Sequence, residues 1–505
     1  MAIAPSQRWR LYALDVASSV SLFLCTSVMA GRVWRFPFDD ELIALAPIER
    51  SHSAGQLAAF YLHGGDIHPP LSFLLFYGLR HAGLTEAQMR LCSLAMTALA
   101  LALFHLLALT LAARRDFKAV PLPTRLIAVL LFGLNALAVS QGDAIRWYPL
   151  FAMLIALFVT LYLAGTNDAA RLWSAVPLGL AASTNFLAVI VALPFVIYRY
   201  GLQRQFRMSF DLAYWLVAAL FGCLGLISAY SIFVRRFDPV IHTEFASGTV
   251  RAAMTEVLGF FGGDALGLGQ AWIIVPAVII SVVAVFCQID RRQPADPVHL
   301  LLLMLAASAL MILPGFAKPR SFLYLAPALA AVLTVFFDRQ AANRNAGVAI
   351  LLVSLIVAPS VGAIANVNFG TRPFKRNSVI PYRSIIDFIQ INETGNVLVV
   401  STDPVIPWEL SHQYRRDDRC ISYFLADSCV NTERRYDSIF IISGHSNESA
   451  DLAVMTRFAS VLATVTAGRQ KVATIHFGED KDAALKSRLT GVALESYILS
   501  VDLYR

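Results

Sequence analysis

Long apolar segments alternate with short polar connectors through the first 366 residues of this 505-residue chain. A helix needs about 20 predominantly apolar residues to cross a bilayer, and many of these segments approach that length. With a window of about 19 residues, the pattern predicts an α-helical polytopic membrane domain over residues 1–366. It has eleven spans, near residues 11–31, 91–113, 125–141, 147–165, 173–184, 186–199, 212–234, 271–288, 298–315, 321–337 and 346–366.

The spans near 173–184 and 186–199 are short, and the span near 11–31 resembles a signal peptide. The pair 173–184 and 186–199 requires a tight turn at Ser183-Thr184-Asn185. The first span follows Arg8 and Arg10, but no small-residue cleavage site precedes its polar end. Because signal peptidase needs such a site, we expect a retained helix.

The pattern changes near Asn366, where charge becomes denser and short β-type runs replace the long apolar segments. A helical stretch, Ser384–Ile391, precedes the first of these runs. Alternating runs of this length predict a small α/β domain over residues 367–505. Its expected strands are Val397–Ser401, Ser438–Ser443, Lys471–His476 and Tyr497–Leu503. Cys420 and Cys429 both fall in this domain, so a local disulfide or two free thiols are the alternatives.

Composition and charge support a membrane protein and orient it. Only 15% of the residues are charged and 57% are hydrophobic, whereas soluble domains carry about 25% charged residues. The net charge of +7 is spread over short loops, which argues against a nucleic-acid partner. Basic residues are denser on one side, so the positive-inside rule predicts a cytoplasmic N-terminus. The predicted inner-loop residues are Arg114, Arg115, Lys118, Arg125, Arg171, Arg199, Arg204, Arg207, Arg291, Arg292, Arg339 and Arg344.

In this orientation the outer face of the inner (plasma) membrane receives loop 32–90, loop 235–270 and the C-terminal domain. Long loops in compact proteins are often functional. The first loop begins with Asp39-Asp40-Glu41 and later contains Asp66-Ile67-His68-Pro69-Pro70-Leu71. The simpler interpretations are a solvated helix start and a rigid loop breaker before an amphipathic stretch at 71–82.

Basic residues also stand at the outer ends of later spans. Arg146 precedes Trp147-Tyr148, and Lys318 and Arg320 precede the span near 321–337. Cations on this side contradict the positive-inside rule, and an anionic lipid head group would account for them. The alternative is that they extend into the phosphates of ordinary phospholipids.

Four motifs in this order resemble those of the GT-C superfamily of membrane glycosyltransferases, which includes protein O-mannosyltransferases and lipid A glycosyltransferases. An Asp-Glu at the head of the first outer loop is matched by Asp40-Glu41. An Asp-x-His-Pro-Pro-Leu element is matched at 66–71, and an Arg-aromatic-Tyr-x-Leu element at 146–150. A late Arg-x-x-x-Tyr-Leu-x-Pro element is matched at 320–327. The resemblance covers residues 10–340.

The resemblance implies transfer of a sugar from a polyprenyl-phosphate-linked donor, with inversion at the anomeric carbon. A carboxylate would deprotonate the acceptor hydroxyl, with Asp40 as the expected base and Asp39 as the alternative. Positive charge would assist departure of the phosphate. The remaining roles are Glu41 or Asp66 orienting the acceptor or holding a divalent cation, Arg146, Lys318, Arg320 and His68 binding the donor phosphate, and Tyr148 and Tyr324 orienting the acceptor.

Other functions and several details stay open. A transporter or flippase of lipid-linked sugars would place ionisable residues in mid-span and show related halves, and neither feature is visible. A polysaccharide ligase or polymerase also works at this face, but it lacks the Asp-Glu pairing. The acceptor is lipid A or lipopolysaccharide, another envelope glycan, or a protein. No metal or other cofactor is assigned.

Overall fold

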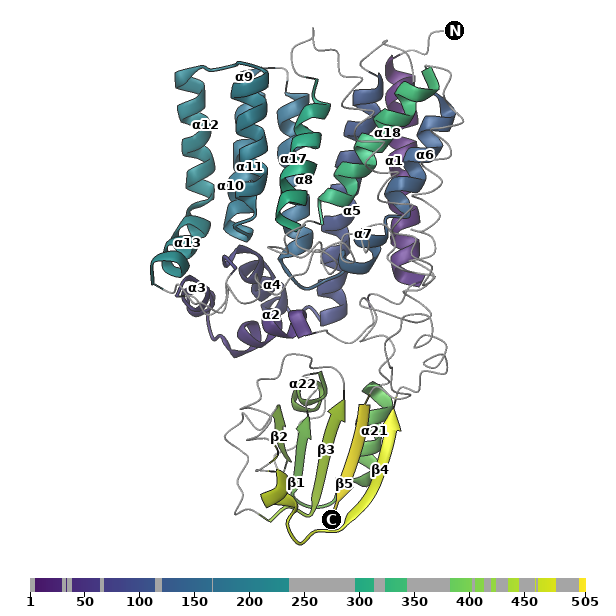
Figure 1. Cartoon of the computed structure of the whole chain (residues 1–505), viewed down its shortest axis with the longest axis vertical. Coiled ribbons are helices and arrows are strands. Elements are labelled where there is room, and N and C mark those ends of the chain that lie inside the picture. Colours follow the sequence, from purple (N-terminus) through teal and green to yellow (C-terminus); the bar gives the residue numbers. More distant parts are fainter. Residues whose placement is uncertain are drawn as a thin grey trace. The chain divides into compact units, whose positions relative to one another are not determined.

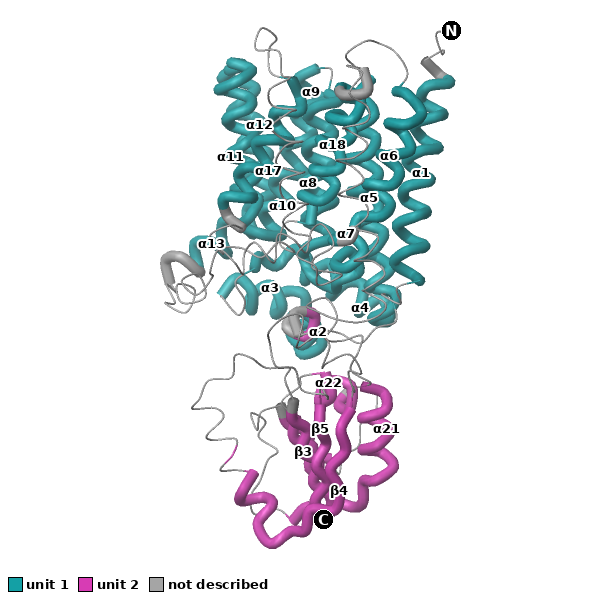
Figure 2. Tube along the Cα trace, turned by 45° about the vertical axis from the view of Figure 1, so that its right-hand side comes forward, with its two compact units in different colours: residues 1–34, 44–369 teal, residues 35–43, 370–505 magenta. Residues whose placement is uncertain are grey.

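The computed structural model describes two compact units. Unit 1 comprises residues 1–34 and 44–369, and unit 2 comprises residues 35–43 and 370–505 (Figure 2). Within them the described residues are 5–29, 33, 39–63, 68–113, 120–165, 167–235, 296–312, 323–342, 382–401, 405–412, 419–423, 435–444, 459, 462–477 and 499–505.

Unit 1 is helical (Figure 1). Its described helices are α1 (Pro5–Met29), α3 (Ala54–Leu62), α4 (Leu71–His81), α5 (Glu86–Ala113), α6 (Leu122–Gly133), α7 (Ala136–Gln141), α8 (Trp147–Ala164), α9 (Asp168–Leu172), α10 (Ala175–Thr184), α11 (Ala188–Val196), the π-helix η2 (Ile197–Leu202), α12 (Met208–Phe221), α13 (Cys223–Arg235), α17 (Val298–Ile312) and α18 (Leu325–Ala342). Helix α2 (Asp39–Arg50) begins in unit 2 and continues into unit 1.

The described helices confirm a multi-pass membrane protein. Four segments are long and apolar enough to cross a membrane, namely Gln7–Met29, Glu86–Ala113, Leu122–Gln141 and Trp147–Ala164. Helices α12 and α13 together would form a fifth, bent by 65°. The predicted spans near 271–288 and 346–366 lie outside the described residues, so the predicted total of eleven is not tested.

Local sequence explains where the predicted spans break. The span near 125–141 is divided into α6 and α7 at Leu134-Asn135, because the Asn135 side chain accepts a hydrogen bond from the Ala138 N–H and begins a new helix. The turn in the short pair lies at 185–187, two residues later than predicted. There the side chain of Asn185 accepts a hydrogen bond from the Leu187 N–H.

Glycines allow α10 to approach its neighbours closely. A Cβ atom on Gly179 would lie 2.3 Å from the carbonyl oxygen of Ala218 on α12, and one on Gly225 would lie 2.2 Å from that of Ala182. Transmembrane helices pack by such close backbone approach, because lipid supplies little hydrophobic drive for association. The seam between α10 and the α12–α13 pair therefore depends on these two glycines.

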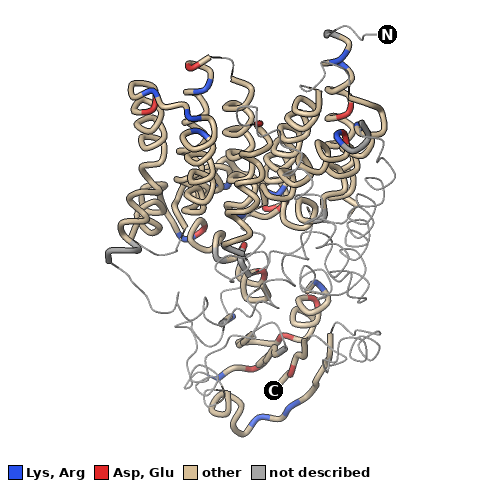
Figure 3. Tube along the Cα trace, turned by 45° about the horizontal axis from the view of Figure 1, so that its top comes forward, with Lys and Arg blue, Asp and Glu red and all other residues tan. Residues whose placement is uncertain are grey.

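The helix bundle of unit 1 has two ends, and different short helices lie at each of them (Figures 1 and 2). The start of α1, helix α9 and the start of α12 lie at one end, called here the N-terminal end. Helices α3, α4, α7 and α13 lie at the opposite end. Charged residues occupy both ends (Figure 3).

Unit 2 contains a five-stranded mixed sheet. The strand order is β2-β1-β3-β5-β4, in which β1 pairs in parallel with β2 and β3, and β5 runs antiparallel to β3 and β4. The strands are β1 (Val397–Ser401), β2 (Arg419–Tyr423), β3 (Ser438–Gly444), β4 (Lys471–Phe477) and β5 (Leu499–Tyr504), and the helices are α21 (Tyr382–Asn392) and α22 (Val405–His412).

The four predicted strands and the predicted helix before them are confirmed with small shifts of their ends. Strand β2 and helix α22 were not predicted. Cys420, on β2, is disulfide-bonded, and its predicted partner Cys429 lies outside the described residues. Arg419 begins β2 and makes a two-bond ion pair with Glu393, with N–O distances of 2.6 and 2.7 Å. Because Glu393 is a buried partner for its charge, Arg419 can lie at the start of a strand in the core.

The sheet is covered on both faces, and one cover includes the start of α2. Val397 and Val399 pack under α21 and α22, whereas Leu398 and Val400 face the opposite layer, as the period-two alternation of a strand requires. Leu42, 7% exposed, belongs to the same apolar cluster as α21 and α22. The acidic first turn of α2 is therefore part of unit 2.

Replacing Leu42 with alanine should destabilise unit 2 by about 2–5 kcal/mol, the usual cost of truncating a buried leucine. Hydrogen exchange of the full chain would show faster exchange across β1 and β3. The control is Ile391→Ala on α21, because Ile391 is 80% exposed. Equal exchange in the two variants would contradict the placement of Leu42 in this core.

Candidate functional site

At the end of unit 1 opposite the N-terminal end, His68 and Arg146 flank one aromatic group. His68 lies just before α4, and its ring centroid is 5.3 Å from that of Trp147, the first residue of α8. Arg146 caps α8 with an extended backbone (φ −145°, ψ 178°). The rigid Pro69-Pro70 pair that starts α4 and the helix start at Trp147 thus bring two predicted phosphate-binding residues together.

Arg146 is held against an aromatic wall. Its side chain is buried, and its guanidinium carbon lies 5.9 Å from the ring centroid of Phe73. Phe73, on α4, stacks on Tyr61 of α3 with centroids 4.0 Å apart. Cations are attracted to aromatic faces, so the Phe73 ring helps to position the Arg146 side chain at the start of α8.

The aromatic group continues from α8 to α18. Trp147 contacts Tyr148 and Phe151, and the Phe151 ring lies 5.8 Å from that of Tyr324. The Tyr324 hydroxyl is 2.8 Å from Oγ of Ser308 on α17. Tyr148 and Tyr324 are therefore both buried near the predicted phosphate residues, and the Tyr324 hydroxyl is engaged inside the helix bundle.

Of the predicted acidic residues and the cations at 318 and 320, the structure describes only part. Asp39 and Asp40 form the first turn of α2, and their side chains lie outside the described part. Glu41, in the same turn, is fully buried. Asp66, Lys318 and Arg320 lie outside the described residues.

Two buried charged residues near this end were not predicted as site residues. Arg90, 2% exposed, lies in the second turn of α5, 3.6 Å from Glu86. Glu86 and Arg90 at i,i+4 have the spacing of an ordinary surface pair, so burial of Arg90 could not be predicted from this pattern. Asp143, three residues before Arg146, is also fully buried. Its place in the Asp143–Tyr148 segment was the available signal.

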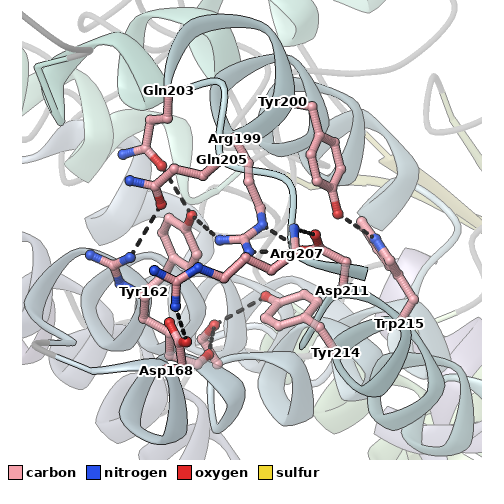
Figure 4. Close-up of polar contacts among 12 residues, drawn as sticks. Tyr162, Asp168, Arg199, Tyr200, Gln203, Gln205, Arg207, Asp211, Tyr214 and Trp215 are labelled. Carbon is pink, nitrogen blue, oxygen red and sulfur yellow. Dashed lines mark hydrogen bonds and ion pairs between the residues drawn. The ribbon is translucent and has the colours of Figure 1, made fainter. Parts of the chain in front are cut away.

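At the N-terminal end, a second polar cluster is organised around Arg199 (Figure 4). Nε and Nη2 of Arg199 each lie 2.8 Å from Oδ1 of Asp211, and Nη1 donates to the Tyr162 hydroxyl at 3.0 Å. Arg199 and Asp211 are 3% and 4% exposed. Arg199 therefore lies in the helix η2 and not in a loop as predicted, and a buried carboxylate neutralises it there.

Comparison with solved structures relates this arrangement to a known fold. The chain matches ArnT from Cupriavidus metallidurans in the apo state with a TM-score of 0.53 and 13% identity, over 99% of this chain and 98% of that one. It matches the same protein bound to undecaprenyl phosphate with a TM-score of 0.52 and 14% identity, over the same shares. This chain has the fold of ArnT. No family model and no curated protein sequence matches it.

The described residues show no group of three histidine, cysteine or acidic side chains placed to hold a metal ion. Of the two residues predicted to help hold a divalent cation, Glu41 is buried and Asp66 lies outside the described residues. The described site thus combines the buried Arg146 and Asp143 with an aromatic surface.

Proposed function

We infer that the protein is a glycosyltransferase that moves a sugar from a polyprenyl-phosphate-linked donor to an acceptor, with inversion. The observation that carries this proposal is the buried Arg146 next to Trp147, whose ring contacts His68, in a chain with the fold of a protein crystallised with undecaprenyl phosphate. A buried cation and a second donor at one end of the helices fit the phosphate of a membrane-anchored donor.

In the proposed reaction, the acceptor oxygen attacks the anomeric carbon while the bond from that carbon to the phosphate oxygen breaks. A carboxylate takes the proton of the acceptor hydroxyl, and Asp40 is proposed for this role, with Asp39 as the alternative. The polyprenyl phosphate leaves with the bonding electron pair. Attack opposite the leaving group inverts the anomeric carbon.

Arg146 would stabilise the departing phosphate through the two parallel N–H groups of its guanidinium. Preorganised charge acts strongly where water is excluded, and Arg146 is 4% exposed. His68, Lys318 and Arg320 are proposed as further donors to the phosphate. Glu41 or Asp66 would orient the acceptor, and Tyr148 and Tyr324 would shape the acceptor side of the site.

The proposed location is the inner (plasma) membrane, with the N-terminus in the cytoplasm and the reaction at the outer face. A lipid-linked donor carries its sugar across the membrane, so an outer-face enzyme needs no nucleotide-binding motif. The acceptor is proposed to be lipid A or lipopolysaccharide, another envelope glycan, or a protein.

Replacing Asp40 with asparagine should abolish transfer, because the amide cannot accept the proton. Mass spectrometry of envelope glycolipids and glycoproteins from a deletion strain should show a missing glycosyl mass that the wild-type gene restores and Asp40→Asn does not. Asp39→Asn tests the alternative base. The control is Asp387→Asn, an exposed carboxylate on α21.

Full restoration by Asp40→Asn and loss with Asp39→Asn would move the base role to Asp39. Full restoration by both single variants and by the double variant would refute a base in this turn. An unchanged glycosyl profile in the deletion strain would refute the transferase itself.

A further inference from the structure

The turn between η2 and α12 presents arginines and bulky apolar side chains at the N-terminal end of unit 1, away from His68 and Arg146. Arg207 is 69% exposed in its ion pair with Asp168, and Arg204 is exposed. The neighbouring apolar side chains are also exposed: Trp173 by 69%, Phe206 by 71% and Met208 by 75%. Basic residues beside exposed aromatic rings are typical of the lipid head-group region.

The geometry of this turn is fixed from inside the bundle (Figure 4). The carboxylate of Asp211 accepts hydrogen bonds from Arg199 and from the backbone N–H of Arg207, the latter at 2.7 Å. The N–H groups of Gln203 and Gln205 donate to carbonyl oxygens of η2, those of Tyr198 and Arg199, at 2.8 and 3.1 Å. Hydrogen bonds to Asp211 and to the carbonyl groups of η2 therefore fix the backbone of the turn.

Arg204 has the left-handed backbone conformation, with φ of 52°, which is unfavourable for residues other than glycine. Within the described part of the chain, no hydrogen bond or ion pair engages its side chain. Asp211 is used by Arg199, and Asp168 by Arg207. The turn thus keeps the Arg204 side chain exposed, and the nearby carboxylates of Asp168 and Asp211 are already paired with other arginines.

Arg171 is the third arginine of this surface. It lies on α9, donates to the Gly165 carbonyl at 3.2 Å and to Gln205 Oε1 at 3.4 Å, and its guanidinium lies 5.7 Å from the Tyr162 ring centroid. Three arginines around one exposed aspartate leave a net charge of +2. This charge favours an anionic ligand at the surface.

We propose that Arg171, Arg204 and Arg207, with Trp173 and Phe206, form a binding site for the phosphate of an anionic phospholipid in the leaflet at the N-terminal end. The arginines contact the phosphate oxygens, and the exposed rings lie among the head groups and upper acyl chains. This site is separate from the proposed donor site and does not depend on the proposed function.

The test is native mass spectrometry of the full chain released from nanodiscs with equal parts phosphatidylglycerol and phosphatidylcholine. The wild type should retain phosphatidylglycerol in preference to phosphatidylcholine. A basic residue near an anionic surface contributes about 1 kcal/mol, so Arg204→Gln should reduce the retained phosphatidylglycerol about fivefold. Arg10→Gln, an exposed arginine on α1 at the same end, is the matched control and should reduce the retained phosphatidylglycerol much less than Arg204→Gln.

Two further variants separate the charge from the backbone. Arg204→Lys should keep most of the bound lipid. Arg204→Gly should lose it as Arg204→Gln does, although glycine favours this backbone conformation. Equal retention in Arg204→Gln and Arg10→Gln would overturn the proposal, as would equal retention of the two lipids by the wild type. Loss of the bound lipid on adding inorganic phosphate at concentrations that leave other lipids bound would assign the site to free phosphate.

Discussion

Replacing Arg146 with glutamine should reduce sugar transfer by about 100- to 1,000-fold, the usual effect of removing one preorganised donor from a developing oxyanion. Arg146 is buried beside Phe73 and Trp147, where little water could replace the missing charge. Arg146→Lys should give an intermediate loss, because lysine keeps the charge but cannot make two parallel hydrogen bonds.

The measurement is the ratio of glycosylated to unglycosylated acceptor in a complemented deletion strain, normalised to folded protein in detergent extracts. The control is Arg125→Gln. Arg125 pairs with Asp15 through two hydrogen bonds of 2.5 and 2.9 Å at the N-terminal end, so its loss should affect yield more than transfer per folded molecule.

The order of the variants distinguishes a phosphate-binding role from a packing role. If Arg146 only packs against Phe73, glutamine and lysine should lower folded yield and leave transfer per folded molecule unchanged. That outcome would remove Arg146 from the donor site. An unchanged transfer in Arg146→Lys together with a large loss in Arg146→Gln would show that charge suffices without the guanidinium geometry.

The helical plan could be predicted because lipid imposes it. A long apolar segment has few alternatives to a spanning helix, so α1, α5 and α8 match the predicted spans closely. Their breaks depend on single side chains, such as the Asn135 cap at α7, and a window of about 19 residues averages these signals away. Strand β1 was equally clear, because Val397–Ser401 is buried throughout.

Contacts between distant segments could not be predicted in the same way. Leu42 lies far from α21 in sequence, and nothing in its local pattern indicates that it packs with Ile385 and Ile386. The motifs did indicate that His68 and Arg146 share one end of the bundle, because their order resembles that of a known family. The aromatic group of Trp147 and Phe151 between α4 and α18 follows only from three-dimensional packing.

Asp211→Asn should be among the most destabilising single substitutions at the N-terminal end of unit 1. Arg199 would then be a buried cation without a carboxylate, and breaking one side of a buried pair costs about 3–5 kcal/mol. Asparagine has almost the same size, so the packing of Arg199 against the rings of Phe210 and Tyr200 is retained. The loss would therefore report the uncompensated charge.

Thermal unfolding in detergent, followed by the amount of monodisperse protein, measures this effect, and Asp168→Asn is the control. Asp168 forms its ion pair at the surface, where such pairs contribute about 0–1 kcal/mol, so this variant should unfold near the wild-type temperature. The double variant Arg199→Met/Asp211→Leu removes both charges and should recover most of the lost stability. If the double variant is as unstable as Asp211→Asn, the hydrogen bonds to Tyr162 and the Arg207 backbone, rather than the balance of charge, stabilise this end of the bundle.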